Sequence, residues 1–135
     1  MRKVSESVDG MQYKVIFLGK LDGLNQYIEA CRKSKYGGNT MKQAAQGKLE
    51  FAINAQLPGV RISRPVIIHY RYFEQRANRD ADNIAGFAHK VFQDALVACK
   101  VLPNDNQKYV RGFTDSFGRD RENPRIEIRI EEIEE

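Results

Sequence analysis

The chain has 135 residues, of which 41% are hydrophobic, a length that suits one domain with a buried core and excludes two. No apolar run approaches the roughly 20 residues that cross a bilayer, and the polar first residues lack the apolar segment of a signal peptide, so we expect a cytoplasmic protein without a membrane span. The formal charge is +4, and because four of the 18 acidic residues lie among the last five, residues 1–130 carry +8, which modestly favours a polyanionic partner.

The first half of the chain predicts one strand and two helices. Residues 1–10 have no apolar periodicity, so we expect a flexible N-terminus ahead of a single domain at residues 11–135. The sequence QYKVIFLG at residues 12–19 has the β-branched and aromatic content of a strand. A short helix follows Asp22, and a second helix begins at Asn39 or Thr40 and ends at Pro58. The apolar side of the short helix consists of Leu24, Tyr27, Ile28 and Cys31.

A basic segment joins these two helices and indicates a flexible loop that ends in two glycines. The cations of this segment, together with Lys20 before the short helix, could clamp a phosphate backbone, and Tyr36 could stack on an exposed base. A solvated helix end and loop is the alternative interpretation. The candidate DNA-binding cations of this region are Lys20, Arg32, Lys33 and Lys35.

The second half of the chain predicts three strands and one long helix. Residues 65–73 (PVIIHYRYF) alternate as a strand, and an apolar pattern with steps of three and four indicates a helix over residues 80–102. Residues 109–114 and 125–133 read as two further strands, joined by a polar turn. The order predicts a small single-domain α/β (α+β) fold, in which a mixed sheet of about four strands packs against helices.

The two cysteines do not form a recognisable metal or redox motif. Cys31 and Cys99 each lie on the apolar side of a predicted helix, and neither belongs to a CxxC or Cys/His cluster. We therefore expect buried, reduced thiols in preference to a disulfide or a metal site.

Three aspartates flank the predicted helix of the second half. Asp80 and Asp82 precede its apolar pattern, and Asp105 follows it. Carboxylates are hard oxygen ligands that suit Mg²⁺ or Mn²⁺, and such ions assist phosphodiester hydrolysis. Capping and solvation explain acids in these positions more often, and Asp82 or Asn83 would be a natural N-cap.

Further polar side chains lie on the same helix. Lys90 follows Asp82 by eight residues, so it lies two turns away on a similar face and could approach a phosphate. The alternative is an i,i+4 ion pair with Asp94. His89 is expected to be a solvated histidine rather than a general base, and His69 a residue of the sheet.

The motifs DADN, FAHKVFQDAL and LPNDNQKYV, spread between Pro65 and the C-terminus, resemble the signature of the RusA-like crossover junction endodeoxyribonucleases. Members of that family resolve Holliday junctions and are often encoded by phages or prophages. The resemblance implies that Asp80, Asp82 and Asp105 bind the metal and that Lys90 is the catalytic lysine. Asn104 departs from the pattern, because many members have the first of two aspartates there, and Asp82 and Lys90 are further apart than in the shortest members.

The resemblance also implies a Mg²⁺-dependent homodimer, with Mn²⁺ as a substitute ion, that nicks symmetrically related strands of branched DNA in recombination and repair. Arg76 and Arg79, together with Lys33 and Lys35, would then grip the flanking phosphates. Two alternatives stay open from the residues alone. One is a non-catalytic module that binds DNA junctions, and the other is a metal-dependent nuclease that acts on flaps, single strands or RNA.

Overall fold

The computed structural model describes residues 11–34 and 36–134, so the predicted flexible N-terminus at residues 1–10 and Lys35 lie outside the described residues. Seven elements follow one another in the predicted order, and the α+β fold class is confirmed. They are β1 (Gln12–Leu18), α1 (Leu24–Lys33), α2 (Gly37–Gln56), β2 (Val66–Glu74), α3 (Ala81–Ala98), β3 (Val110–Arg119) and β4 (Arg125–Glu132).

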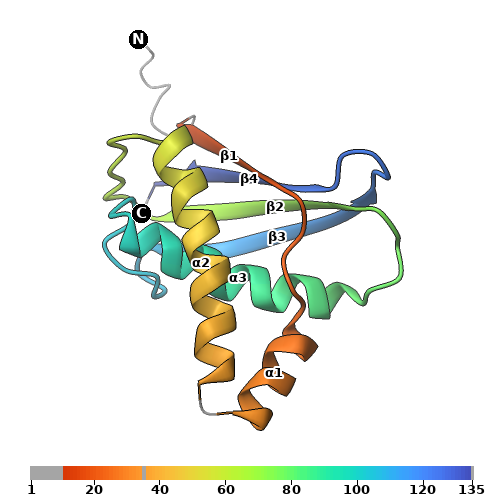
Figure 1. Cartoon of the computed structure of the whole chain (residues 1–135). Coiled ribbons are helices and arrows are strands. Elements are labelled where there is room, and N and C mark those ends of the chain that lie inside the picture. The colour runs from red at the N-terminus through yellow and green to blue at the C-terminus, as the bar shows by residue number, and fades with distance from the viewer. Residues whose placement is uncertain (1–10, 35, 135) are drawn as a thin grey trace.

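The four strands form one mixed sheet in the order β1-β4-β2-β3. β4 pairs antiparallel with both β1 and β2, whereas β2 and β3 run parallel. A parallel pair needs a long crossover connection, and α3 provides it by running back along the sheet between β2 and β3. Figure 1 shows α2 and α3 passing over the same side of the sheet, with α1 beside them.

The core lies between the helices and one face of the sheet. Along β2, the residues from Val66 to Glu74 alternate between buried and more exposed positions, which gives a strand with one face in the core. The three isoleucines of β4 are buried beside it. Helix α3 supplies the largest helical share of the core, with buried Ile84, Phe87, Ala88, Val91, Phe92, Ala95 and Leu96. Among the described residues, no helix has both the length and the apolar content to cross a bilayer.

Charged and polar side chains occupy the opposite face of the sheet, which the helices leave uncovered. His69 lies on this face, as predicted for a residue of the sheet, and its ring contacts Thr114 Oγ1 at 2.7 Å and Glu131 Oε1 at 2.8 Å. Arg71 and Arg125 both lie within ion-pair distance of Glu127. His69, Arg71 and Arg125 therefore have acidic partners within the sheet.

Two helix ends differ from the prediction. Helix α3 ends at Ala98, four residues early, because Lys100 adopts a left-handed backbone with φ of 63° and the N–H groups of Val101 and Leu102 both bond to the Leu96 carbonyl. Helix α2 begins at Gly37, so the two glycines expected in a loop are helical. A Cβ atom on Gly38 would lie 2.2 Å from Cys31 Sγ, so this close approach of α1 and α2 requires glycine.

Strand β3 and the cysteines also correct the prediction. β3 continues to Arg119, five residues beyond the expected end, because pairing with β2 up to Glu74 gives the polar backbone its hydrogen bonds. Both cysteines are free thiols, as expected. The prediction of burial is wrong for Cys31, which is exposed at the end of the structure where α1 has no buried residue, and Cys99 is only half-buried.

Candidate functional site

The start of α3 presents two carboxylates to solvent. Asp80 is the N-cap residue, so the expectation of Asp82 or Asn83 at that position is wrong. The Asp80 carbonyl accepts the Ile84 N–H at 3.1 Å, while its side chain makes no capping hydrogen bond. Asp82 follows in the first helical turn, and both acids are exposed and without a side-chain partner in the described part of the chain. The positive end of the helix dipole stabilises these charges and leaves their oxygens available to a ligand.

Asn83, the last residue of the DADN motif, has a structural role. Its Oδ1 accepts the backbone N–H of Asn25 at 2.7 Å, so a side chain of α3 satisfies a free donor in the first turn of α1. A Cβ atom on Gly23 would lie 2.6 Å from the Asn83 amide, so a side chain before α1 would displace Asn83 from this hydrogen bond. The Gln26 side chain accepts the Gly23 N–H at 2.8 Å. Asn83 therefore fixes α1 to the start of α3.

Replacing Asn83 with alanine should lower the free energy of unfolding by about 0.5–2 kcal/mol, the usual effect of losing an N-terminal helix cap. Urea denaturation measures this as a lower transition midpoint with an unchanged slope. Asn39→Ala is the matched control, because Asn39 is exposed in the first turn of α2 and has no side-chain hydrogen bond among the described residues. Equal midpoints for the two variants would contradict the structural role of Asn83.

Asp105 lies at the other end of α3. The 18 residues of this helix span about 27 Å at the usual rise per residue, and Figure 1 shows its two ends on opposite sides of the domain. Asp105 is exposed and its carboxylate has no partner in the described part. Within one chain the three aspartates therefore do not frame a common site. No set of three His, Cys, Asp or Glu side chains that could hold a metal occurs among the described residues.

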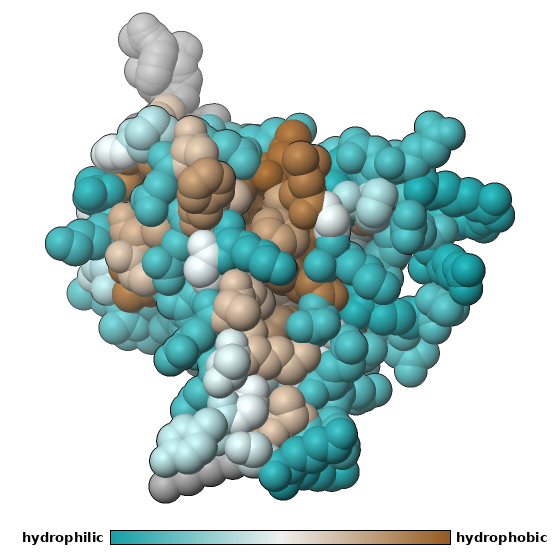
Figure 2. Space-filling view, viewed as in Figure 1, coloured by the Kyte–Doolittle hydropathy of each residue, from teal (hydrophilic) through white to brown (hydrophobic). Residues whose placement is uncertain are grey.

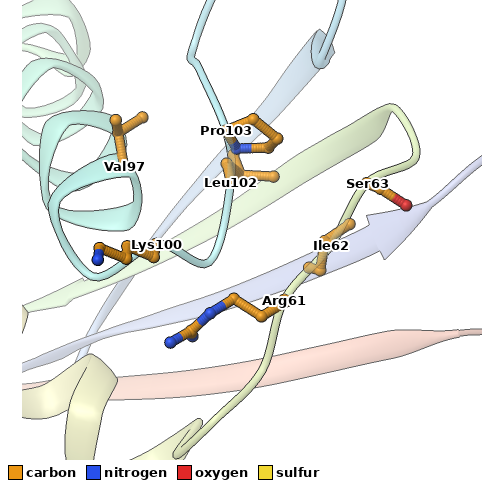
Figure 3. Close-up of a pocket in the computed structure, with 7 residues that line it drawn as sticks. All are labelled: Arg61, Ile62, Ser63, Val97, Lys100, Leu102 and Pro103. Carbon is orange, nitrogen blue, oxygen red and sulfur yellow. The ribbon is translucent and has the colours of Figure 1, made fainter.

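Asn104, the residue that departs from the family pattern, stabilises the loop. Its Oδ1 accepts the Asn106 N–H at 3.0 Å, and Asn106 Oδ1 in turn accepts the Lys108 N–H at 3.0 Å. These local bonds form the turn that carries Asp105. Next to this loop lies a cavity of about 360 Å³, which Figure 3 shows between the segment before β2 and the end of α3; Arg61, Lys100 and Pro103 are among its lining residues.

Lys90 lies in the middle of α3. Eight residues of helical rise place it about 12 Å along the axis from Asp82. It is exposed and has no partner in the described part of the chain, because Asp94, the alternative i,i+4 partner, pairs with Lys42 of α2. The interpretation of Lys90 as the ion-pair partner of Asp94 is therefore wrong, and its ammonium group is available to a ligand.

A polar cluster missed in the sequence lies where α3 meets β3. His89 Nε2 and the Tyr72 hydroxyl both lie 2.8 Å from the same oxygen of Asp115, so the tyrosine donates a hydrogen bond to a carboxylate. The His89 ring is sandwiched at 4.6 Å from both Tyr70 and Phe113. Burial and the bond to Asp115 raise the pKa of Tyr72, which keeps the phenol protonated. The prediction of a solvated His89 is wrong, since its side chain is only 23% exposed.

A cluster of arginines lies at the end of the sheet nearest the start of α3. Arg76, between β2 and α3, lines the same hollow as Arg119, the last residue of β3, and Arg121 of the following turn. Arg79 is less available than predicted, because its Nε lies 3.0 Å from Glu74 Oε1 and a second nitrogen contacts the other carboxylate oxygen. Glu74 is only 8% exposed, and Arg79 neutralises this buried charge.

The other predicted DNA-binding cations lie elsewhere. Arg32 and Lys33 end α1, at the tip of the projection that α1 and the first half of α2 form below the sheet in Figure 1. Figure 2 shows hydrophilic side chains gathered on one side of this tip. Lys20 is exposed in the connection between β1 and α1, and Lys35 is outside the described residues. Of the predicted cations that the structure describes, Arg76 and Arg79 lie in the connection that leads into Asp80, whereas Arg32 and Lys33 lie at the far end of α1.

No protein-family model matches the chain, and a search of curated proteins finds no match either.

Proposed function

We propose that the protein is a Mg²⁺-dependent, structure-specific endodeoxyribonuclease that resolves four-way DNA junctions as a homodimer. The observation that carries the proposal is the start of α3, where the exposed carboxylates of Asp80 and Asp82 lie beside an arginine cluster. Carboxylates flanked by cations suit a site that must attract a phosphodiester and also bind a divalent ion. The motif resemblance supplies the substrate, branched DNA.

The residues of the site divide into two tasks. Arg76, Arg119 and Arg121 attract the DNA backbone and neutralise phosphates next to the bond that is cut. Lys90, with an ammonium group that has no partner among the described residues, is proposed to offset the negative charge that develops on the phosphate during attack. Mg²⁺, or Mn²⁺ in its place, would polarise the phosphate and activate the attacking water.

The carboxylates of one chain do not complete such an ion site. Asp80 and Asp82 both carry exposed carboxylates at the start of α3, and these would supply part of the shell of a hard cation. Asp105 does not reach them, because it follows the far end of α3, a helix about 27 Å long. We therefore propose that each site of the homodimer combines Asp80 and Asp82 of one copy with Asp105 of the other. A two-fold axis would then generate two equivalent sites, one for each of two symmetric strands.

The test compares a synthetic four-way junction with linear duplexes of the same sequence, at fixed salt and with Mg²⁺ or Mn²⁺. We expect paired nicks in two opposing strands of the junction and no cuts in the duplexes. A junction that is bound and left intact with both ions would replace the proposal with a non-catalytic binding module. Equal cleavage of flaps or single strands would instead indicate a nuclease without junction specificity.

A further inference from the structure

A hollow of about 390 Å³ opens between the connection from β2 to α3 and the last residues of β3. This volume lies within the usual range of small-molecule sites, about 300–1,000 Å³. Ala81 of the first helical turn lines it, so the hollow adjoins Asp80. Its inner part is apolar, because Tyr72 and Ile84 are both buried there.

One wall of this hollow is an exposed aromatic ring. Phe117 of β3 is 44% exposed, and its ring lies nearly parallel to that of Tyr72, with centroids 5.0 Å apart and planes 13° apart. Tyr72 is 1% exposed and is held in place by its hydrogen bond to Asp115, so its ring is a fixed surface against which the Phe117 ring packs. A supported ring with an open part is the surface on which unpaired bases stack in proteins that bind single strands.

Cations surround this apolar hollow. Arg76 and Arg119 are exposed and line it from two sides. Arg79 and Glu74 also line it, but they neutralise each other through their two contacts. The hollow therefore offers a flat apolar wall together with two arginines that have no acidic partner among the described residues. This chemistry matches a nucleotide, which has one apolar, flat part and one negative part.

We propose that the hollow receives one unpaired nucleobase of the DNA substrate, which stacks on Phe117 while Arg76 and Arg119 bind its flanking phosphates. The proposal rests on the proposed nuclease function and names the substrate feature that the site reads. The proposal requires that the protein opens a base pair at the branch point of the junction, and stacking on Phe117 would offset the cost of opening it. A base held in this hollow would position the neighbouring phosphate at the start of α3, beside Asp80 and Asp82.

The chain has no tryptophan, so Phe117→Trp introduces a single reporter at this wall. We would titrate this variant with a single-stranded thymidine oligonucleotide, and with an abasic strand of the same length, in EDTA. We expect the tryptophan emission to be quenched by the thymidine strand and to change little with the abasic strand. Phe113→Trp is the matched control, because Phe113 has the same 44% exposure on the same strand but does not line the hollow.

Two further measurements on the same strands keep the test independent of how the tryptophan variant folds. A strand with 2-aminopurine, a fluorescent base, should be quenched by the unaltered chain. Phe117→Ala should weaken binding of the thymidine strand about tenfold, within the range for one lost stacking contact, and Phe113→Ala should not. Neither measurement requires cleavage, so an inactive nuclease that still passes both would leave the base site standing.

Two results would overturn the base site. Equal responses to thymidine and abasic strands would mean that the arginines bind phosphates and that no base enters. A tryptophan emission at Phe117→Trp that shifts with protein concentration in the absence of DNA would mean that a second copy of the chain covers the hollow. In either case junction cleavage, measured separately, would still decide the nuclease function.

Discussion

Replacing Asp82 with asparagine should reduce the rate of junction cleavage at least about 10³-fold, equivalent to about 4 kcal/mol of transition-state stabilisation. The amide keeps the shape of the side chain but loses the negative charge that a hard divalent ion requires. Junction binding without metal should stay equal or become slightly tighter, because one negative charge near the phosphates is removed. The measurement is the cleavage of an end-labelled four-way junction with Mg²⁺, alongside binding in EDTA.

The structure indicates that this change should not unfold the protein. Asp82 is exposed and has no side-chain partner in the described part, so its loss removes only a favourable charge near the helix dipole, worth about 0.3–1 kcal/mol. Glu29→Gln is the matched control for a lost surface charge, since Glu29 is also exposed, lies within α1 and has no side-chain partner in the described part of the chain. Cleavage by the Asp82→Asn variant within tenfold of the unaltered chain would show that Asp82 is not a metal ligand.

The sequence predicts an element of the fold well where one face of that element is buried, because burial leaves a periodic apolar pattern. The alternation of β2 and the three- and four-residue steps of α3 each correspond to a buried face in the structure. β3 was predicted too short because its second half has no apolar pattern. The helices leave this half exposed, so positions such as Asp115 and Phe117 need not all be apolar. Because Thr114 and Ser116 are polar as well, this segment has no alternation of apolar and polar residues, and the strand is evident only from its pairing with β2.

The sequence proposes a set of residues for the candidate site but does not predict how they are arranged. The motifs propose Asp80, Asp82 and Asp105 as one set of ligands. Membership of one set does not bring them together in space, because the rigid helix α3 separates Asp105 from the other two. Arg119 enters the site only because β3 pairs in parallel with β2, which aligns it with Glu74. Such long-range pairing cannot be read from a local window of sequence. The same pairing brings Asp115 to His89.

Mixing two inactive variants should restore cleavage if each site takes its acids from two copies. In a heterodimer of Asp82→Asn and Asp105→Asn chains, one site carries both substitutions and the other carries neither. Random exchange makes about half of the dimers mixed, and under two-fold symmetry one of the two sites in each mixed dimer is intact. The mixture should therefore contain about a quarter as many intact sites as the same amount of unaltered protein. We expect each variant alone to be inactive and the mixture to nick one strand of the junction at about a quarter of the normal rate.

The matched control mixes Asp80→Asn with Asp82→Asn, two changes at the same end of α3. Every site of that heterodimer carries one substitution, so no cleavage should return. Differently tagged copies, purified through one tag and probed for the other, verify that subunits exchange. If exchange is complete and the first mixture stays inactive, Asp105 does not complete a site across two copies. If Asp105→Asn is active by itself, then the carboxylates at the start of α3 act without Asp105. The length of α3 would then give no reason for a second copy of the chain to complete the site.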